Sequence, residues 1–337
     1  MKHLTPFALI LCSLFVSMTF NSCTKENITD PSEVNKYQVT LNFSGEMPEV
    51  EYTPLSRVGS SDLIGIQVYS CPESDVNGMS YAPCAFGLFD TMENMTLGLL
   101  EGYKYKFTAT LLLDAKNKLA GFGNYFSLPF EVQSQINIDL TMNNFMLSND
   151  SYYTSLATGR TYMTSGYYDY PTIDRYYGET LDYIPEENGK VTIEMKRVVF
   201  GVKYIIKGMT EGSLKVTMKD APELVVPYNA TNPEAAVSTE TMIHSFSSIY
   251  GAYSNDNFQE SLPITFVWAK ETGEIPQGTF TFDFKRKQVT TITFRVTEED
   301  LLDNGMNINI EGGDLINGNE FYVENGEVVD TEIDPTN

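Results

Sequence analysis

The sequence is short of histidine, tryptophan, cysteine and basic residues. Its 337 residues include two His, one Trp and four Cys, and 22 Lys and Arg stand against 45 Asp and Glu, for a formal net charge of −23. So acidic a surface repels phosphate backbones and anionic lipid, which disfavours nucleic-acid binding and electrostatic docking to a membrane. Beyond the N-terminal leader only His244 remains, which is too little for a histidine zinc site or a Ser-His-Asp triad.

Motifs for catalysis are missing as well. The chain contains no Gly-x-Ser-x-Gly elbow, no phosphate-binding loop, no His-Glu-x-x-His and no Cys-x-x-Cys pair. Carboxylates are frequent, but they concentrate in turns and tails such as Glu298–Asp300 and Asp330–Asp334, where a solvated face is their ordinary role. His244 is expected to be structural. We therefore expect a non-enzymatic protein that has no metal site and needs no cofactor.

An apolar run at the N-terminus predicts export. Met1–His3 supplies a basic start, and Phe7–Phe20 carries no charge and is mostly apolar. The run has the length expected of a signal peptide and is too short to span a bilayer, which takes about 18 or more residues. No later segment is long or apolar enough for a transmembrane helix. The sequence therefore predicts a signal peptide over residues 1–22.

The predicted signal peptide ends next to a cysteine. Ser22-Cys23 resembles the end of a bacterial lipobox, and cleavage before Cys23 would leave an N-terminal cysteine with several acyl chains, palmitate among them, enough for stable anchoring. The polar, non-periodic residues 23–35 predict a flexible tether. Lys25-Glu26 is similar to the signal that routes Bacteroidetes lipoproteins to the outer face of the outer membrane. The alternative is ordinary secretory cleavage, with Cys23 incidental.

Most of the remaining chain has apolar residues at every second position, as expected for half-buried strands. Short strands separated by turn residues predict an all-β protein built from β-sandwiches. The alternation is clearest over residues 37–43, 64–68, 103–111, 136–142, 191–195, 200–206, 280–284 and 292–296. The predicted divisions are an N-terminal sandwich (36–147), a tyrosine-rich connector (148–188), a C-terminal sandwich (189–320) and an acidic tail (321–337).

Three local features add detail to this division. We expect a short helix or a long crossover within Ala115–Phe130. The alternation slips across Arg197–Val199, which predicts a bulge or bend. A basic turn at Lys285–Gln288 lies between two alternating segments and predicts a hairpin.

The predicted connector is the best candidate for a recognition surface. It contains nine tyrosines, and Tyr gives a large contact area together with a hydroxyl at low side-chain entropy cost. Tyr167, Tyr168 and Tyr170 are the candidate contact residues, for a host protein or a glycan. The alternative is that these rings pack between the two domains or cover a sheet edge.

Two further cysteines, Cys71 and Cys84, flank a loop between two predicted strands. In an exported protein they can form a disulfide, worth about 3 kcal/mol on the chain-entropy model. Two buried reduced thiols are the equally weighted alternative.

Three segments resemble the fimbrillin family, the subunits and the lipidated anchor or tip proteins of Bacteroidetes type V pili. They are Thr53–Arg57 with Asp62–Ile66, then Val191–Val202, and then Phe280–Val296. The resemblance implies two tandem transthyretin-like (Greek-key) β-sandwiches, other pilin subunits as partners, and a role in cell adhesion.

The resemblance also implies assembly by donor-strand exchange, in which a strand of one subunit fills a groove in its neighbour. In polymerising members a protease cuts an arginine-bearing loop. Here Arg57 would be the cleavage site, and cleavage would free the strand Lys36–Gly45. The alternative is that Arg57 sits in a solvent-exposed turn and is not cut.

A second function fits the same lipid anchor and sandwich fold, namely a surface glycan-binding lipoprotein of a polysaccharide-uptake system. Such proteins usually place several tryptophans against sugar rings. This chain has only Trp268, although tyrosines can substitute.

Overall fold

The computed structural model describes residues 35–47, 61–76, 81–92, 95–127, 137–139, 143–147, 156–233, 235–298 and 308–315. Several predictions fall outside these residues: the signal peptide, Cys23 and nearly all of the tether, the loop with Arg57, residues 148–155 of the connector, and the acidic tail. Within the described ranges, no helix is long and apolar enough to cross a membrane.

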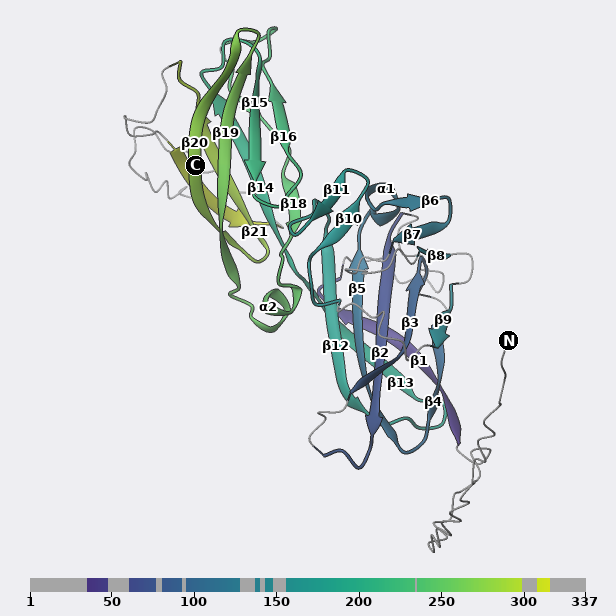
Figure 1. Ribbon diagram of the computed structural model, residues 1–337. Coiled ribbons are helices and arrows are strands. Elements are labelled where there is room, and N and C mark those ends of the chain that lie inside the picture. Colours follow the sequence, from purple (N-terminus) through teal and green to yellow (C-terminus); the bar gives the residue numbers. More distant parts are fainter. Residues whose placement is uncertain are drawn as a thin grey trace, which may run out of the picture. The chain divides into compact units, whose positions relative to one another are not determined.

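Nearly all of the described elements are strands, which confirms the all-β prediction (Figure 1). Up to Arg197 they are β1 (Lys36–Gly45), β2 (Leu63–Pro72), β3 (Ala82–Phe89), β4 (Thr96–Leu100), β5 (Tyr103–Leu112), α1 (Ala115–Lys118), β6 (Gly121–Phe122), β7 (Tyr125–Ser127), β8 (Asn137–Asp139), β9 (Phe145–Leu147), β10 (Thr161–Met163), β11 (Gly166–Tyr168), β12 (Arg175–Tyr183) and β13 (Lys190–Arg197).

The later elements are β14 (Val199–Lys207), β15 (Ser213–Met218), β16 (Leu224–Pro227), β17 (Val237–Ser238), β18 (Met242–Ser245), α2 (Ile249–Ser254), β19 (Gln259–Lys270), β20 (Gly273–Lys285), β21 (Gln288–Arg295) and β22 (Ile308–Asp314). The single turn of α1 lies inside the range where a short helix was expected. The second helix, α2, has Ser248 as its N-cap, and the Ser248 Oγ accepts a hydrogen bond from the Gly251 N–H at 3.2 Å.

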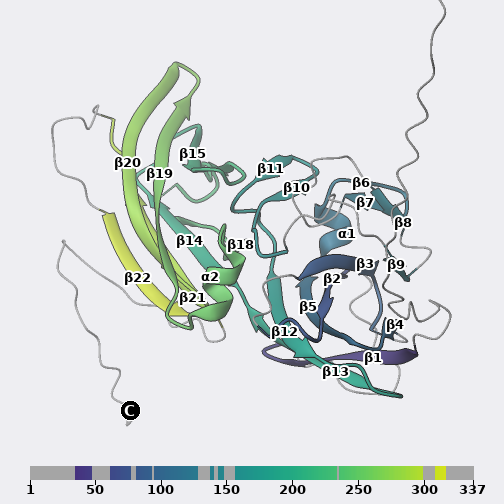
Figure 2. The ribbon, with the colours of Figure 1, turned by 60° about the horizontal axis from the view of Figure 1, so that its bottom comes forward.

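The first sandwich is one sheet that folds over itself (Figure 2). Its strand order is β4-β1-β13-β12-β5-β2-β3-β9, but β12 and β13 share only two residue pairs, which lets the sheet bend there. One layer is β4-β1-β13 and the other is β12-β5-β2-β3-β9. The core between them is mainly aliphatic: Val39, Leu41, Leu97, Leu99, Val191 and Ile193 from the first layer, and Ile64, Ile66, Val68, Phe107, Ala109 and Leu111 from the second.

The second sandwich has two separate sheets with an aromatic core. One sheet follows the order β17-β14-β21-β22, with β18 also paired to β14, and the other follows β16-β15-β19-β20. The rings of Phe266 and Phe294 stack at a centroid distance of 4.2 Å and an interplanar angle of 4°. Phe200 and Phe284 stack at 4.8 Å. These rings come from both sheets and hold the two layers together.

The predicted division at residues 148–188 and 189–320 differs from the observed one. The strand β12 lies inside the predicted connector and β13 inside the predicted C-terminal sandwich, but both pair within the first sheet. The alternation slip at Arg197–Val199 marks the place where the chain leaves β13 and enters β14 in the second sandwich. Val198 between them is buried, and its N–H donates to the Arg175 carbonyl at 2.9 Å. The slip is a crossing between sheets.

The predicted hairpin at Lys285–Gln288 is wrong in its pairing. The turn is present, but β20 pairs with β19, whereas β21 pairs with β14 and β22. The two apolar faces, with Phe282 on β20 and Phe294 on β21, both belong to the core between the sheets. An apolar face on each strand fits a hairpin and a sheet-to-sheet crossing equally well, so the pattern alone could not separate them.

Candidate functional site

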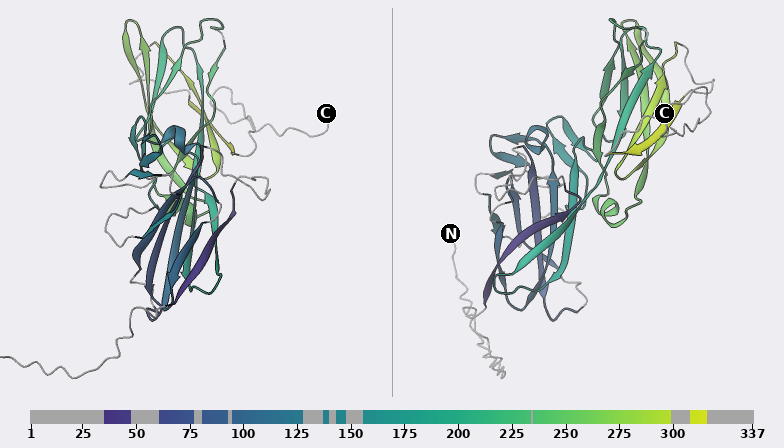
Figure 3. Two further views of the ribbon diagram at one scale, coloured as in Figure 1. Left: turned by 90° about the vertical axis from the view of Figure 1, so that its right-hand side faces the viewer. Right: turned by 180° about the vertical axis from the view of Figure 1, so that it is seen from behind.

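The strand β1 lies between two neighbours in the first sheet (Figures 1 and 3). Residues 36–40 pair antiparallel with β4, and residues 40–45 pair in parallel with β13. Each half of the strand therefore bonds mainly to a different neighbour. Without β1, the facing edges of β4 and β13 would both carry unpaired backbone groups, which is the arrangement that accepts an added strand.

Few side chains of β1 are fully buried. Val39 and Leu41 point into the core, while Tyr37 and Phe43 on the same face are half-buried. Full burial of a Val or Leu side chain is worth about 1.5–3 kcal/mol. The packing of β1 thus rests on two deep contacts, and contacts at its ends must contribute the rest.

The end of β1 depends on a glycine. Gly45 has φ +100°, and a Cβ there would lie 2.4 Å from the Met195 carbonyl oxygen of the neighbouring β13. A residue with a side chain would be strained in this backbone conformation and would clash with that carbonyl. The next N–H, that of Glu46, donates to the same Met195 carbonyl at 2.8 Å, which fixes the direction in which the Glu46 side chain leaves the strand.

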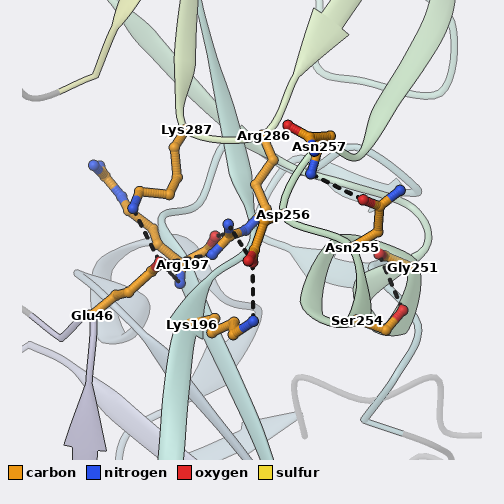
Figure 4. A network of polar contacts seen from close by, with 10 residues as sticks. All are labelled: Glu46, Lys196, Arg197, Gly251, Ser254, Asn255, Asp256, Asn257, Arg286 and Lys287. Carbon is orange, nitrogen blue, oxygen red and sulfur yellow. Dashed lines mark hydrogen bonds and ion pairs between the residues drawn. The ribbon is translucent and has the colours of Figure 1, made fainter.

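The Glu46 carboxylate accepts three hydrogen bonds (Figure 4). Oε2 accepts from Nη2 of Arg286 at 2.7 Å and from the backbone N–H of Arg197 at 2.9 Å, and Oε1 accepts from Nζ of Lys287 at 3.0 Å. Arg286 and Lys287 form the turn between β20 and β21, so this carboxylate joins the end of β1 to the second sandwich. We call Glu46, Arg197, Arg286 and Lys287, together with Asp256, the carboxylate clamp.

Arg286 is the buried centre of the carboxylate clamp. Its side chain is 2% exposed, and its Nε donates to the Arg197 carbonyl at 2.9 Å. Its Nη1 lies 3.3 Å from Oδ1 of Asp256, which also pairs with Lys196 at 3.0 Å. Since the Asp256 side chain is 69% exposed, solvent weakens that ion pair, and Glu46 is the better-shielded partner of Arg286.

Positive charge is concentrated around this carboxylate. Burial, the strongest single influence, raises the pKa of Glu46, but the hydrogen bonds from the Arg197 backbone and Lys287, with the charges of Arg286 and Lys287, outweigh it. The pKa of Glu46 therefore lies below its usual 4.5. Four cations meet three carboxylates here: Lys196, Arg197, Arg286 and Lys287 against Glu46, Asp256 and Asp174, the last paired with the Arg197 guanidinium at 2.7 Å.

The candidate disulfide is not formed, because Cys71 and Cys84 are free thiols. Cys71 is buried in β2 and lies opposite Lys104 of β5. Cys84 falls at the irregular step of the β2–β3 ladder, where its thiol donates to the Val68 carbonyl at 3.5 Å. Burial raises the pKa of the Cys84 thiol to about 11. In the structure both thiols are reduced, with Cys71 buried and Cys84 half-buried.

The three candidate tyrosines separate into two places. Tyr167 and Tyr168 lie on β11, in a hairpin with β10, and the Tyr167 ring stacks on Tyr162 at 4.3 Å with an angle of 16°. Tyr167 is 52% exposed and Tyr162 is 38% exposed. Tyr170 instead packs against the core, edge-on to Phe200 at 6.4 Å. The hairpin displays an exposed ring pair, and Tyr170 follows the packing alternative.

A buried arginine fastens this hairpin to the first sheet. Arg175, at the start of β12, donates through Nη1 to the Thr158 carbonyl at 3.0 Å and through Nη2 to the Thr161 hydroxyl. Burial lowers the pKa of Arg175 to about 9. Its Nε is a buried donor with no hydrogen-bond partner among the residues that the structure describes. The guanidinium thus fixes the base of the β10–β11 hairpin and leaves the ring pair at its outer side.

His244 lies inside the second sandwich. Its ring stacks on Phe200 at 5.5 Å, and its Nδ1 lies 3.1 Å from the Tyr170 carbonyl oxygen. Burial lowers the pKa of His244 to about 4, so the ring is neutral at pH 7. The side chain is buried and stacks on a core ring, the setting expected of a structural histidine.

The comparisons with known proteins add only solved structures. No family model and no curated protein match the chain. Similar structures include a candidate cell adhesion protein from Bacteroides eggerthii (11% identity, 83% of this chain and 96% of that chain, TM-score 0.37). A fimbrial anchor protein from Porphyromonas gingivalis is 9% identical and has a TM-score of 0.34, with 77% of this chain and 91% of that chain covered. A tip fimbrial protein from the same organism is 8% identical and has a TM-score of 0.30, with 83% of this chain and 100% of that chain covered. At these TM-scores the likeness carries no argument about function.

Proposed function

We propose that this chain is a non-enzymatic surface lipoprotein of a fimbrium, acting as a subunit, tip or anchor that supports cell adhesion. In this proposal, acylated Cys23 holds it to the outer membrane, and it joins other pilin subunits by strand exchange at the position of β1. The single observation that carries the proposal is the place of β1, an N-terminal strand paired on both sides yet fully burying only Val39 and Leu41.

The backbone of β1 supports exchange. A strand that replaced it could regain the ladders to β4 and β13 with many different sequences, because those bonds use main-chain groups. Its side chains would need to fill only the two deep positions. Affinity would then come from the backbone ladders, and specificity would come from the two apolar positions and the end of the strand.

Exchange can be tested on the full chain. A protease recognition sequence inserted after Ser56 allows the chain to be cut between β1 and β2 while β1 stays in place. A labelled peptide of residues 36–47, amidated at its C-terminus, is then added. Native mass spectrometry measures how much of the protein has bound the peptide. We expect the cut chain to take up the peptide and the uncut chain to exclude it. A cut chain that keeps its own β1 and takes up no peptide would overturn the proposal.

The lipid anchor has a separate test. Replacement of Cys23 by Ser should move the protein from the membrane fraction to the soluble fraction, because several acyl chains are needed for stable attachment. Mass spectrometry of the wild-type N-terminus should show an acylated cysteine, and an unmodified Cys23 thiol would remove this part of the proposal.

The second candidate function, a glycan-binding surface lipoprotein, is favoured by the exposed Tyr162–Tyr167 pair. Aromatic rings on a surface hairpin can stack on sugar rings. Retention of the protein in a polysaccharide affinity gel, lost on Tyr167→Ala, would favour this function over fimbrial assembly.

A further inference from the structure

We infer that the groove occupied by β1 recognises a strand whose last paired residue is a glycine followed directly by a carboxylate. The partner is an extended segment of another pilin subunit, with apolar side chains at the Val39 and Leu41 positions and an Asp or Glu at the Glu46 position. This inference rests on the proposed function, since it concerns what replaces β1.

The first step is that the carboxylate clamp would remain as an anion site after β1 left. Three donors converge on Glu46: Arg286 Nη2, the Arg197 N–H and Lys287 Nζ, at 2.7–3.0 Å. None of them belongs to β1, so all three stay with the protein. A buried guanidinium that loses its carboxylate is costly, whereas a new carboxylate at the same point restores a charge-assisted bond.

The second step is that no other acid of the site replaces Glu46. Asp256 bonds to a different atom of Arg286, Nη1, at 3.3 Å, and it is shared with Lys196. Asp174 is held by the Arg197 side chain at 2.7 and 2.9 Å. Removal of Glu46 would therefore leave four cations against two carboxylates at this point, although the whole chain has a formal net charge of −23. This local excess of positive charge favours an acidic residue on the partner.

The third step is that the backbone fixes where the acid must be. Gly45 faces the Met195 backbone with no room for a Cβ, and the next N–H bonds to the Met195 carbonyl. A replacing strand in the same register needs glycine at that point. The next residue then has the direction that takes Glu46 into the clamp, whereas an acid one residue earlier or later would leave on another side.

The chain's own C-terminal residues do not match this pattern well. The predicted acidic tail contains Gly326-Glu327, but aligning Gly326 with Gly45 places Glu324 at the half-buried Phe43 position and Glu320, just before the tail, at the buried Val39 position. Charged side chains at apolar positions disfavour this pairing. This mismatch favours a strand from a different subunit as the partner. It also makes the C-terminal segment a suitable control peptide.

The test uses the cut full chain described above and four amidated peptides. These are residues 36–47, the same peptide with Glu46→Gln, the same with Glu46→Lys, and residues 317–328 as the misaligned control. We expect roughly tenfold weaker binding for Glu46→Gln, a larger loss for Glu46→Lys, and a difference that shrinks in high salt. Lys287→Gln in the protein should reduce the preference for Glu over Gln.

The outcomes separate the two proposals. Equal binding of the native and Glu46→Gln peptides would overturn the carboxylate requirement while strand exchange stood. Tighter binding of the 317–328 peptide would replace the partner by a second copy of this chain and overturn the inference in that way. Absence of uptake for every peptide would overturn strand exchange itself, and the inference with it.

Discussion

The strands β1 and β19 differ in what holds them. Each lies between two neighbours, and they are of similar length, 10 and 12 residues. β19 buries Leu262, Ile264, Phe266 and Trp268, whereas β1 fully buries only Val39 and Leu41. Trp268 is further fixed by a hydrogen bond from its Nε1 to the Glu211 carbonyl at 2.8 Å. β19 is held by packing, whereas β1 depends more on its ladders and on a charged contact at one end.

Under the proposed function, this difference is the reason to expect exchange at β1 and not at β19. Removing a deeply buried strand from its sheet costs packing energy at every buried side chain, because each one leaves a cavity behind. A strand held by main-chain bonds and one carboxylate can be replaced by any segment that offers the same groups. The predictions below are ordered by the size of the expected effect and test this contrast.

The largest effect is expected in β19. Phe266→Ala removes a ring that stacks on Phe294 and contacts Phe282, and it should lower the free energy of unfolding by about 3–5 kcal/mol. Urea denaturation measures the loss. Thr265→Ala is the matched control on the same strand; its hydroxyl bonds to Thr279 of β20, and the substitution should cost less than about 1 kcal/mol. Equal losses would mean that packing does not dominate here.

In β1, Leu41→Ala should cost less, about 2–3 kcal/mol, at the low end for buried leucine. It should also accelerate the loss of β1 from the cut chain, because the strand would then keep a single fully buried side chain. The exposed neighbour Asn42→Ala is the control and should leave both quantities nearly unchanged. A cost as large as that of Phe266→Ala would remove the proposed contrast between the strands.

Acid should weaken the aromatic core of the second sandwich first, through His244. Its folded pKa of about 4 lies below the 6.5 of the free group, so the unfolded chain binds a proton at a higher pH. The stability that depends on neutral His244 is full above pH 6.5 and is lost as the pH falls toward 4, by up to a few kcal/mol at about 1.4 kcal/mol per pKa unit. In His244→Gln, urea midpoints between pH 7 and 5 should change less than in the wild type.

The carboxylate clamp should respond at lower pH. The folded pKa of Glu46 is lowered, so its stabilising effect is present above about pH 4.5 and is lost as the pH falls through the folded value. At pH 7, Glu46→Gln should cost about 1 kcal/mol, since the carboxylate is partly exposed and bonds to charged donors. High salt should reduce that cost. If Glu46→Gln lowers the free energy of unfolding as much as Leu41→Ala does, and salt does not change that loss, the end of β1 is not held by charge.

The strands could be predicted from the sequence, but their partners could not. The alternation of residues 37–43 locates β1 because burial on one face depends only on the local pattern. Val191–Met195 and Phe200–Ile206 alternate in the same way, yet β13 and β14 belong to different sandwiches. Sheet membership depends on contacts far along the chain, which a local pattern does not contain.

The candidate site shows the same limit. The basic turn at Lys285–Gln288 was visible in the sequence, but its partner Glu46 was not, because 240 residues separate Glu46 from Arg286. The available signal was Gly45-Glu46 directly after an alternating strand. The tyrosine-rich segment carries exposed rings, but only the surroundings of each ring separate Tyr167 from Tyr170.

The smallest effect on stability is expected at the exposed ring pair. Tyr167→Ala removes a stacked ring from the outer side of the β10–β11 hairpin, where Arg175 already fixes the base, so the free energy of unfolding should change by less than about 0.5 kcal/mol. Tyr170→Ala should cost more, because that ring packs against Phe200. Cell adhesion is measured beside stability for both variants. Loss of adhesion in Tyr167→Ala at unchanged stability would assign the hairpin to recognition. Unchanged adhesion, with stability lost only in Tyr170→Ala, would show that these tyrosines serve packing only. The position of β1 would then remain as the proposed site of partner binding.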